Sequence, residues 1–230
     1  MYSGDTEVKN VTLILAAAGV GKRMGLDYPK QFLKIDGKAL YIKSLEVAEK
    51  SIFVKEIIIV TGKDFIESIK NECKEHKFKK VIKVIEGGSE RQHSIKKALD
   101  LCSEDSIISV QDGVRPFLKE RYFKESIEIL NKNKDIAGVV VGVPVKDTIK
   151  KINSLGVVES TPKRDELFAI HTPQTFRGDI LKRAYKKAEE DIYLGTDDSS
   201  LVERIGEEIK LLLGDYDNIK ITTVEDLKYL

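Results

Sequence analysis

Short aliphatic runs recur along the chain, and amphipathic stretches separate them. The runs typical of strands buried on both faces are Val11–Leu15, Glu56–Val60, Val81–Ile85, Ser106–Val110 and Ala137–Val143. The intervening stretches typical of helices are Ala39–Glu49, Lys63–Glu75, Gln92–Leu101 and Lys119–Asn131. This alternation predicts an α/β fold, in which a mostly parallel sheet is covered by helices on both faces. Right-handed crossovers then bring the strand-to-helix loops to one edge of the sheet, where ligands bind.

The pattern changes to a period of two residues after Val143. Two runs of alternating polar and apolar residues, 144–152 and 166–171, flank a turn signal at 153–156. We expect them to form a protruding antiparallel β-arm, at about residues 144–172 of a single domain that spans residues 1–230. An isolated hairpin is marginal in water, so the arm needs a second surface, and we expect a homodimer. Beyond the arm the pattern predicts helices at Gly178–Asp191 and Asp198–Gly206, a strand at Ile209–Leu213, a strand-like run at Ile219–Thr222 and a final helix.

The charge balance of the chain is close to neutral. Its 230 residues include 39 Lys and Arg against 38 Asp and Glu, a net charge of +1. Such a balance does not favour nucleic acid or a membrane as a partner, and any anion site must be local. The apolar runs are too short to span a bilayer, and the first ten residues lack a targeting pattern. Two cysteines outside any motif and three histidines without metal-ligand spacing indicate reduced thiols, a cytoplasmic protein and no zinc site.

A loop of small residues follows the first strand and carries the most informative pattern of the chain. Ala16–Gly21 would let a ligand approach the backbone, whose N–H groups can bind phosphate. Lys22, Arg23 and Lys30 follow and could neutralise a triphosphate. The loop lacks the hydroxyl residue that a P-loop requires after Gly-Lys, and its glycines do not match the dinucleotide fingerprint. The pattern therefore indicates another kind of nucleotide site, although a glycine-rich turn with solvated cations would look the same.

Four later segments carry polar residues at or beside predicted strand ends. They are Gly87–Ser94, Gln111–Pro116, Thr196–Ser199 and Asp217–Thr222. We expect the first to pack on a base, with Ser94 and Arg91 adding hydrogen bonds, and the second to bind a sugar hydroxyl or a metal–phosphate cluster. Each segment also has an ordinary explanation. The first could be a turn with Ser89 as the helix cap, and the second an Asp–Arg pair that braces a turn. The third could be a helix cap at Thr196 or Asp197, and the fourth a surface segment with a solvated Lys220.

Six motifs occur in order along the chain and together resemble one family. They are Ala16-Ala17-Ala18-Gly19-Val20-Gly21-Lys22-Arg23-Met24 with Pro29-Lys30-Gln31-Phe32-Leu33, Gly87-Gly88-Ser89-Glu90-Arg91-Gln92-His93-Ser94, Asp112-Gly113-Val114-Arg115-Pro116, Asp147-Thr148-Ile149-Lys150, Thr172-Pro173-Gln174 and Asp217-Asn218-Ile219-Lys220-Ile221-Thr222. The first resembles the signature of the sugar-phosphate nucleotidylyltransferases. The whole set resembles the 2-C-methyl-D-erythritol 4-phosphate cytidylyltransferases of the non-mevalonate isoprenoid pathway, from about Val11 to the end of the chain. The resemblance implies a Rossmann-like fold and conversion of CTP and the alcohol phosphate into a CDP-alcohol and pyrophosphate, with Mg²⁺ bound mainly through the CTP phosphates.

The same resemblance implies roles for individual residues. The catalytic cations would be Arg23 and Lys30. The nucleotide would lie against Ala17, Ala18, Gly19, Gly21, Gly88 and Ser94. The alcohol phosphate would lie near Asp112, Arg115, Thr196 and Lys220, and the arm would deliver Thr148 and Arg164 to the site of the other subunit. An ionised phosphate attacks in such a reaction, so the protein needs to position and neutralise charge rather than supply a nucleophile.

The chain departs from the usual pattern of the family at a few positions. Gln111 stands where the family often has His, Gly113-Val114 where it often has Ala-Ala, and Ser89 where it often has Asp. We expect backbone contacts rather than residue 89 to read the base. Two alternatives stay open. A ribitol 5-phosphate cytidylyltransferase would share the CTP loop, and a non-catalytic CTP-sensing subunit would share the fold.

Overall fold

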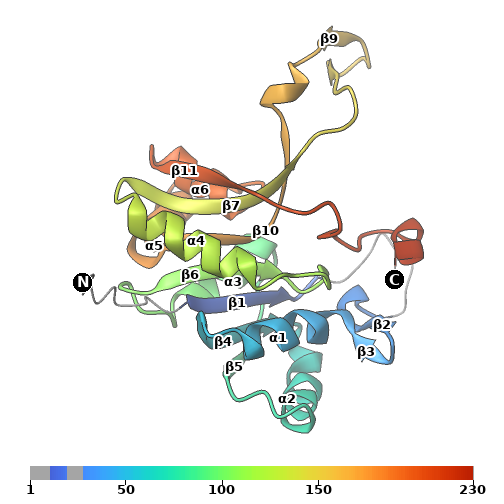
Figure 1. The fold of residues 1–230 in the computed structure, drawn as a ribbon, viewed down its shortest axis with the longest axis vertical. Coiled ribbons are helices and arrows are strands. Elements are labelled where there is room, and N and C mark those ends of the chain that lie inside the picture. Colours follow the sequence, from blue (N-terminus) through green and yellow to red (C-terminus); the bar gives the residue numbers. More distant parts are fainter. Residues whose placement is uncertain (1–10, 20–27, 230) are drawn as a thin grey trace, which may run out of the picture.

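The computed structural model describes residues 11–19 and 28–229, and a seven-stranded sheet forms its centre (Figure 1). The strands of this sheet are β1 (Val11–Ala17), β4 (Val54–Thr61), β5 (Val81–Glu86), β6 (Ile107–Asp112), β7 (Ile136–Pro144), β10 (Phe168–Arg177) and β11 (Glu208–Leu213). Their order across the sheet is β11-β7-β10-β6-β1-β4-β5. Pairs among β6, β1, β4 and β5 are parallel, as is β7 with β11, whereas β10 runs antiparallel to both β6 and β7. The prediction of a mostly parallel, Rossmann-like sheet is therefore confirmed.

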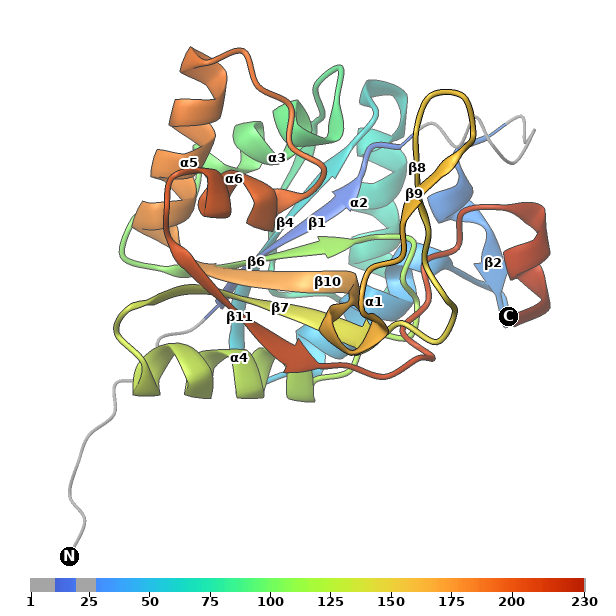
Figure 2. The ribbon, with the colours of Figure 1, turned by 90° about the horizontal axis from the view of Figure 1, so that it is seen from above.

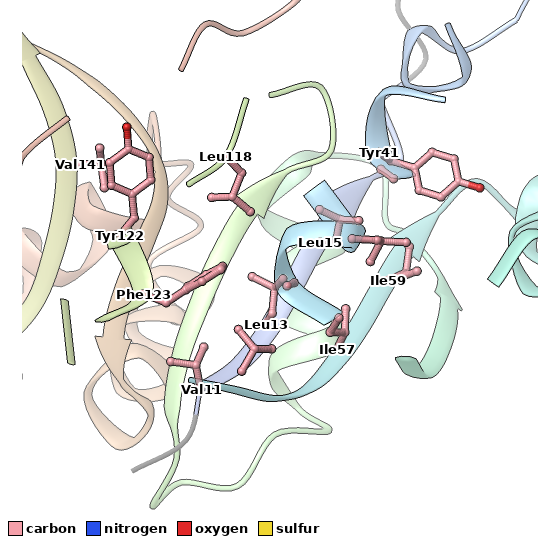
Figure 3. Packing of buried hydrophobic residues seen from close by; sticks show 14 of the residues in the cluster. Val11, Leu13, Leu15, Tyr41, Ile57, Ile59, Leu118, Tyr122, Phe123 and Val141 are labelled. Atoms are coloured by element: carbon pink, nitrogen blue, oxygen red, sulfur yellow. The ribbon is translucent and has the colours of Figure 1, made fainter. Parts of the chain in front are cut away.

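Helices cover both faces of the sheet, as the alternation of elements predicts. On one face lie α1 (Leu40–Lys50), α2 (Ile66–Glu75) and α4 (Arg121–Lys132), and on the other lie α3 (Arg91–Leu99), α5 (Gly178–Glu190) and α6 (Asp198–Arg204). Figure 2 shows α4 and α5 on opposite sides of the strands. Because side chains alternate along a strand, Leu13 and Leu15 of β1 enter one core and Ile14 enters the other (Figure 3). All three are fully buried, which explains why this run has no polar face.

The arm differs in pairing from the prediction. Short strands β8 (Lys151–Ile152) and β9 (Val158–Ser160) pair with each other and project beyond the layered body (Figure 1). The run 166–171 does not pair within the arm. It enters β10, where Phe168 lies opposite Pro144 of β7. The segment outside the sheet therefore runs from 145 to 167. The alternating residues at 168–171, which we expected in the arm, belong to a strand of the main sheet.

The predicted final helix is present, whereas the strand-like run before it does not form a strand. The run Ile219–Thr222 is not a strand, although the Ile221 N–H donates to the Val114 carbonyl at 2.9 Å and the Ile221 side chain is buried. The final helix is a 3-10 helix, Val224–Tyr229. Other short elements have no clear signal in the sequence: the strands β2 (Lys34–Ile35) and β3 (Lys38–Ala39), and the 3-10 helices Lys30–Phe32 and Arg164–Glu166. A further 3-10 helix, Lys63–Phe65, forms the start of the helical stretch predicted at 63–75. Within the residues that the structure describes, no helix has the length and apolar character needed to cross a membrane.

Candidate active site

A cleft of about 340 Å³ opens at the edge of the sheet where β1 and β6 end. Its lining comes from the end of β1, the segment before and within the first turn of α3, the end of β6 and the C-terminal segment. The lining residues are Ala16, Ala18, Gly19, Lys30, Gln31, Gly88, Ser89, Glu90, Arg91, Ser94, Asp112, Val114 and Lys220. The predicted site residues Ala18, Gly19, Lys30, Gly88, Ser94, Asp112 and Lys220 thus meet in one place, although they are distant in sequence.

The end of β1 is fixed from several sides. The carbonyl of Ala17 accepts hydrogen bonds from Gln31 Nε2 and from Thr61 Oγ1, and the carbonyl of Ala16 accepts one from the Gly113 N–H at 2.9 Å. Ala17 itself is buried beneath the cleft. Gln31, which the sequence did not single out as a site residue, therefore ties the segment carrying Lys30 to the strand end. Gly21 and Arg23 lie outside the described residues.

The loop before α3 is held by a hydroxyl group from the first turn of that helix. The Gly88 N–H donates to Ser94 Oγ at 2.9 Å, and that hydroxyl donates to the Glu90 carbonyl at 3.0 Å. A Cβ at Gly88 would lie 2.5 Å from His93 Cβ, so the loop accepts only glycine there without moving. Ser94 therefore supports the wall of the cleft through hydrogen bonds within the loop. Ser89 is not the cap of α3, because Glu90 occupies the N-cap position.

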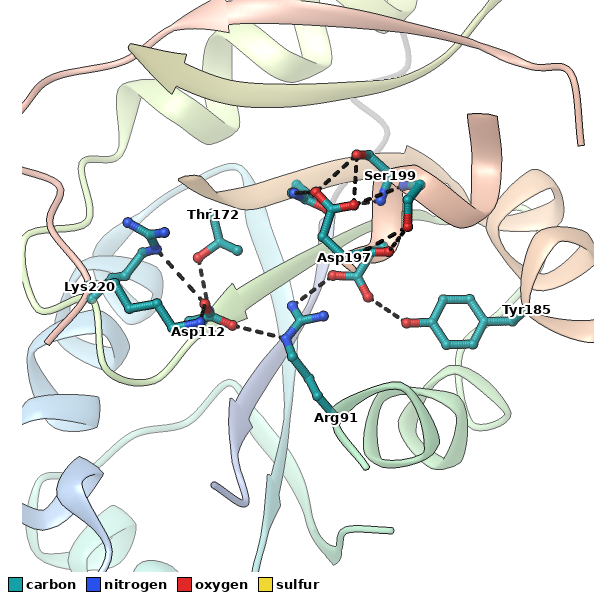
Figure 4. A network of polar contacts seen from close by, with 11 residues as sticks. Arg91, Asp112, Thr172, Tyr185, Asp197, Ser199 and Lys220 are labelled. Carbon is teal, nitrogen blue, oxygen red and sulfur yellow. Dashed lines mark hydrogen bonds and ion pairs between the residues drawn. The ribbon is translucent and has the colours of Figure 1, made fainter. Parts of the chain in front are cut away.

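Asp112 is the centre of the charge arrangement. It ends β6, is 6% exposed and has cations on both carboxylate oxygens: Arg91 Nε is 3.2 Å from Oδ1, and Lys220 Nζ is 2.7 Å from Oδ2 (Figure 4). Arg115 Nε lies 3.9 Å from Oδ2. Burial favours the neutral acid, but the three cations outweigh it and hold the pKa of Asp112 well below its usual range. Lys220 is therefore paired at the cleft rather than simply solvated.

Arg91, which we expected to add hydrogen bonds to a base, lies in the lining of the cleft. Its Nη2 donates to Asp198 Oδ2 at 2.7 Å, and its Nε donates to Asp112 Oδ1 at 3.2 Å. Asp198 is fully buried at the start of α6 and also accepts a hydrogen bond from the Tyr185 hydroxyl. Burial opposes the charge of Arg91, but the two carboxylates outweigh this effect and raise its pKa.

Arg115 lies behind the cleft rather than in its lining. Its Nη1 donates to the Asn218 carbonyl at 2.7 Å, and burial lowers its pKa despite the nearby Asp112 carboxylate. Asn218 in turn donates to the Thr172 carbonyl, and Thr172 Oγ1 accepts the Asp112 N–H at 3.0 Å. These bonds join the end of β6 and the middle of β10 to the segment that carries Lys220. Thr172 was part of a recognised motif, but its contact with Asp112 follows only from the fold.

Thr196 lies on an exposed turn just before α6. The next residue, Asp197, is the helix cap: its side chain accepts the Ser200 N–H at 2.9 Å and also accepts from Gln174 Nε2. Gln92 holds the preceding residues, because the Gly195 N–H donates to its Oε1 at 2.9 Å. The turn with Thr196 is thus held on two sides, although Thr196 does not line the cleft.

Thr148 and Arg164 lie on the arm and are exposed. Arg164 Nη1 donates to the Lys146 carbonyl at 3.1 Å, a contact within the arm. Neither residue lines the cleft of its own chain. The arm also exposes apolar side chains, including Ile152, Leu155 and Val158.

The donor set around the cleft does not suit a metal held by the protein alone. Among the described residues, no group of three or more His, Cys, Asp or Glu side chains could hold a metal ion. Both oxygens of Asp112 already face cations. A divalent ion needs several oxygen ligands, so in this cleft a ligand such as a polyphosphate would have to supply most of them.

The cleft therefore combines features suited to a phosphorylated ligand. Backbone at Ala18 and Gly19 lies open to it, and the side chains of Lys30, Arg91 and Lys220 line it. Ser89 and Ser94 are the hydroxyl residues in the described lining: Ser94 bonds to backbone, and Ser89 Oγ is 2.9 Å from Nδ1 of the exposed His93. Such a site can orient anions and stabilise negative charge.

Comparisons with known proteins point to one family. A family model described as IspD, 2-C-methyl-D-erythritol 4-phosphate cytidylyltransferase, matches residues 11–229. A protein of that name from Fusobacterium nucleatum is 50% identical over 232 residues, with 100% of each chain covered. One from Alkaliphilus metalliredigens is 45% identical over 219 residues, covering 94% of this chain and 90% of its own.

Solved structures agree in fold. The crystal structure of 4-diphosphocytidyl-2C-methyl-D-erythritol synthase from Anaerococcus prevotii matches with a TM-score of 0.84 and 33% identity, covering 96% of this chain and 94% of its own. That of 2-C-methyl-D-erythritol 4-phosphate cytidylyltransferase from Francisella tularensis matches with a TM-score of 0.80 and 26% identity, covering 96% and 97%.

Proposed function

The chain belongs to the 2-C-methyl-D-erythritol 4-phosphate cytidylyltransferase family, and on this basis we propose how its cleft carries out the reaction. The protein is a nucleotidyltransferase that joins CTP to 2-C-methyl-D-erythritol 4-phosphate and releases pyrophosphate. The observation that carries the proposal is the meeting of Ala18, Gly19, Lys30, Gly88, Asp112 and Lys220 in one cleft.

The chemistry needs charge neutralisation more than a nucleophilic side chain. An oxygen of the alcohol phosphate attacks the α-phosphorus of CTP and forms the new P–O bond. The bond from that phosphorus to the bridging oxygen breaks, and pyrophosphate leaves with the electron pair. Two anions must approach each other, so cations and backbone N–H groups stabilise the transition state.

We assign the two halves of the cleft to the two substrates. The strand end at Ala17–Gly19 and the loop at Gly88–Ser94 take the cytidine and triphosphate, with Lys30 and the residues Gly21 and Arg23. The paired Asp112 and Lys220, with Arg115 behind them and Thr196 on the adjacent turn, take the alcohol phosphate. Mg²⁺ would be held mainly by the CTP phosphates and would neutralise part of their charge, which fits the lack of a group of three or more metal ligands among the described residues.

The experiment that tests this function measures pyrophosphate release with Mg²⁺ and CTP. Equal concentrations of 2-C-methyl-D-erythritol 4-phosphate and ribitol 5-phosphate are compared. We expect turnover with the former. Turnover mainly with ribitol 5-phosphate would retain the CTP half of the assignment and refute the alcohol. Release with neither substrate would favour a CTP-sensing subunit.

We further propose that the enzyme is a homodimer in which the arm completes the site of the partner. The exposed apolar side chains of the arm give it a surface to bury, and Arg164 and Thr148 lie outside the cleft of their own chain. Mixing inactive Arg164→Ala and Lys30→Ala homodimers tests this, after partial unfolding and refolding. Activity should return, because one site in each mixed dimer has an intact arm and an intact Lys30. Failure to regain activity in dimers shown to be mixed would contradict the shared site.

We also propose that the protein acts in the cytoplasm. Cys73 and Cys102 are buried free thiols, and burial raises the pKa of Cys73 to about 11 and that of Cys102 to about 12. Such thiols are unreactive and suit a reducing compartment. Fractionation of cells, followed by immunoblotting, checks this location.

A further inference from the structure

We propose that Arg91, with Asp198 and Tyr185 behind it, positions the Asp112 carboxylate and through it the Lys220 ammonium at the cleft. Arg91 is then a positioning residue for the reaction rather than a ligand of the cytosine base. The inference rests on the proposed function in one respect, that Lys220 acts on the alcohol phosphate.

The contacts form a continuous chain of hydrogen bonds and ion pairs (Figure 4). The Tyr185 hydroxyl donates to Asp198 Oδ1, and Arg91 Nη2 donates to Asp198 Oδ2 at 2.7 Å. Arg91 Nε donates to Asp112 Oδ1 at 3.2 Å, and Lys220 Nζ lies 2.7 Å from Asp112 Oδ2. Each carboxylate uses different oxygens for its two neighbours, so the position of one group constrains the next.

Asp198 and Tyr185, at the far end of this series of contacts, are too deeply buried to meet a substrate. Asp198 is 0% exposed and Tyr185 is 2% exposed, and neither lines the cleft. A buried carboxylate is costly unless it is paired, so Asp198 holds Arg91 and Arg91 holds Asp198. The function of Asp198 and Tyr185 must therefore be exerted through Arg91.

The position of Arg91, between the two carboxylates, requires a guanidinium group. The planar fork of Arg91 presents separate N–H groups to two carboxylates that come from β6 and α6. A lysine offers one point charge and cannot hold both in this geometry. Neighbouring Gln92 binds the turn before α6, through the Tyr193 carbonyl and the Gly195 N–H. The first turn of α3 thus links the loop assigned to CTP with the residues assigned to the alcohol phosphate.

The test compares two substitutions with two matched controls. Tyr185→Phe removes one hydroxyl and Arg91→Lys removes the fork. The controls are Tyr41→Phe, a buried tyrosine that donates to Glu72 outside the cleft lining, and Arg177→Lys, which binds backbone carbonyls at the opposite end of the sheet. We expect Tyr185→Phe to lower kcat/KM for the alcohol phosphate about tenfold, the usual effect of losing a hydrogen bond to a charged group, with the Kd of CTP unchanged. Arg91→Lys should have a larger effect, and the controls should match the wild type.

A double-mutant cycle separates positioning from general structural damage. In a Lys220→Ala background, Tyr185→Phe should cause little further loss, because the group that it helps to position is gone. A loss as large as in the wild type would overturn the proposal, as would equal activities of Tyr185→Phe and Tyr41→Phe.

A measurement without turnover keeps the inference distinct from the proposed function. The rate of reductive methylation of Lys220, followed by mass spectrometry without substrates, should rise severalfold in Arg91→Lys, whereas that of exposed Lys134 should not change. An unchanged rate at Lys220 would refute the positioning role. If the wild type fails to release pyrophosphate, the proposed function is wrong, and the methylation rate still decides whether Arg91 positions Lys220.

Discussion

Lowering the pH should destabilise the folded protein through His171, a histidine of β10 whose side chain packs near Arg115. Its Nδ1 is buried and has no hydrogen-bond partner in the described part of the chain. Burial and, to a smaller extent, the charge of Arg115 lower the pKa of His171 from 6.5 to about 4. The folded state therefore holds this imidazole neutral over a range in which the unfolded chain is protonated.

The sign and size of the effect follow from that difference. Between pH 6.5 and pH 4 the unfolded chain takes up a proton at residue 171 and the folded protein does not, so the free energy of unfolding decreases as the pH falls. Each unit of pKa difference corresponds to about 1.4 kcal/mol, so the full loss is about 3 kcal/mol. Asp112 and Asp215 titrate below this range in the folded state, because neighbouring cations hold both pKa values down. Their contribution to stability is lost at more acidic pH.

Urea unfolding at intervals between pH 7 and pH 4.5 measures the effect, with His171→Gln as the comparison. The wild type should lose stability relative to the variant over this interval, and the difference between the two should level off above about pH 7. Parallel curves for the two proteins would refute the reasoning, because they would show that residue 171 binds no more protons in the unfolded chain than in the folded one.

Three further outcomes are expected from substitutions at the site. Lys30→Ala should lower kcat by a factor of about 10²–10³ and leave Tm unchanged, as measured by pyrophosphate release and calorimetry; near-normal turnover would remove Lys30 from the mechanism. Gly88→Ala should raise the KM for CTP and cost about 1–3 kcal/mol in urea unfolding, because its Cβ would lie 2.5 Å from His93 Cβ. Asp197→Ala should cost about 1 kcal/mol by removing the cap on the Ser200 N–H, and Asp197→Asn should restore part of it.

Hydrophobic patterning was sufficient to predict the parallel half of the sheet. Residues such as Leu13, Ile14 and Ile58 are buried on both faces, so their strands consist of uninterrupted aliphatic runs. Asp112 is the last residue of such a strand, β6, and Gly88 comes two residues after the edge strand β5, which is partly exposed. The geometry of parallel strands then brings both residues to one edge of the sheet. The strands, and the position of the cleft at their carboxyl ends, were therefore predictable from local sequence patterns.

The buried part of β10 escaped prediction because its buried residues are polar. Thr172, Gln174 and Thr175 are at most 5% exposed, yet each has a partner: Thr172 accepts from the Asp112 N–H, Gln174 binds Asp197, and the hydroxyls of Thr175 and Ser109 are 2.9 Å apart. Hydropathy reads such residues as solvent-exposed, and these partners are distant in sequence.

The carboxylate partners of Arg91 could not be predicted for a similar reason. Its helix starts beside the glycine loop, but Asp112 and Asp198 are 21 and 107 residues away in the chain. No local spacing contains this information, because the partners meet Arg91 only when the end of β6 and the start of α6 come together at the first turn of α3.

The pairing of Pro144 with Phe168 makes the arm an insertion in a β-hairpin. The Val145 N–H also donates to the Leu167 carbonyl at 3.1 Å, so the chain leaves and re-enters the sheet at adjacent points. Residues 145–167 could therefore be exchanged for a short turn without altering the register of β7 and β10 or any residue that lines the cleft. The layered body and the arm are thus joined at one pair of adjacent points, so the arm can be removed to test its proposed role in the partner's site while the cleft of its own chain stays the same.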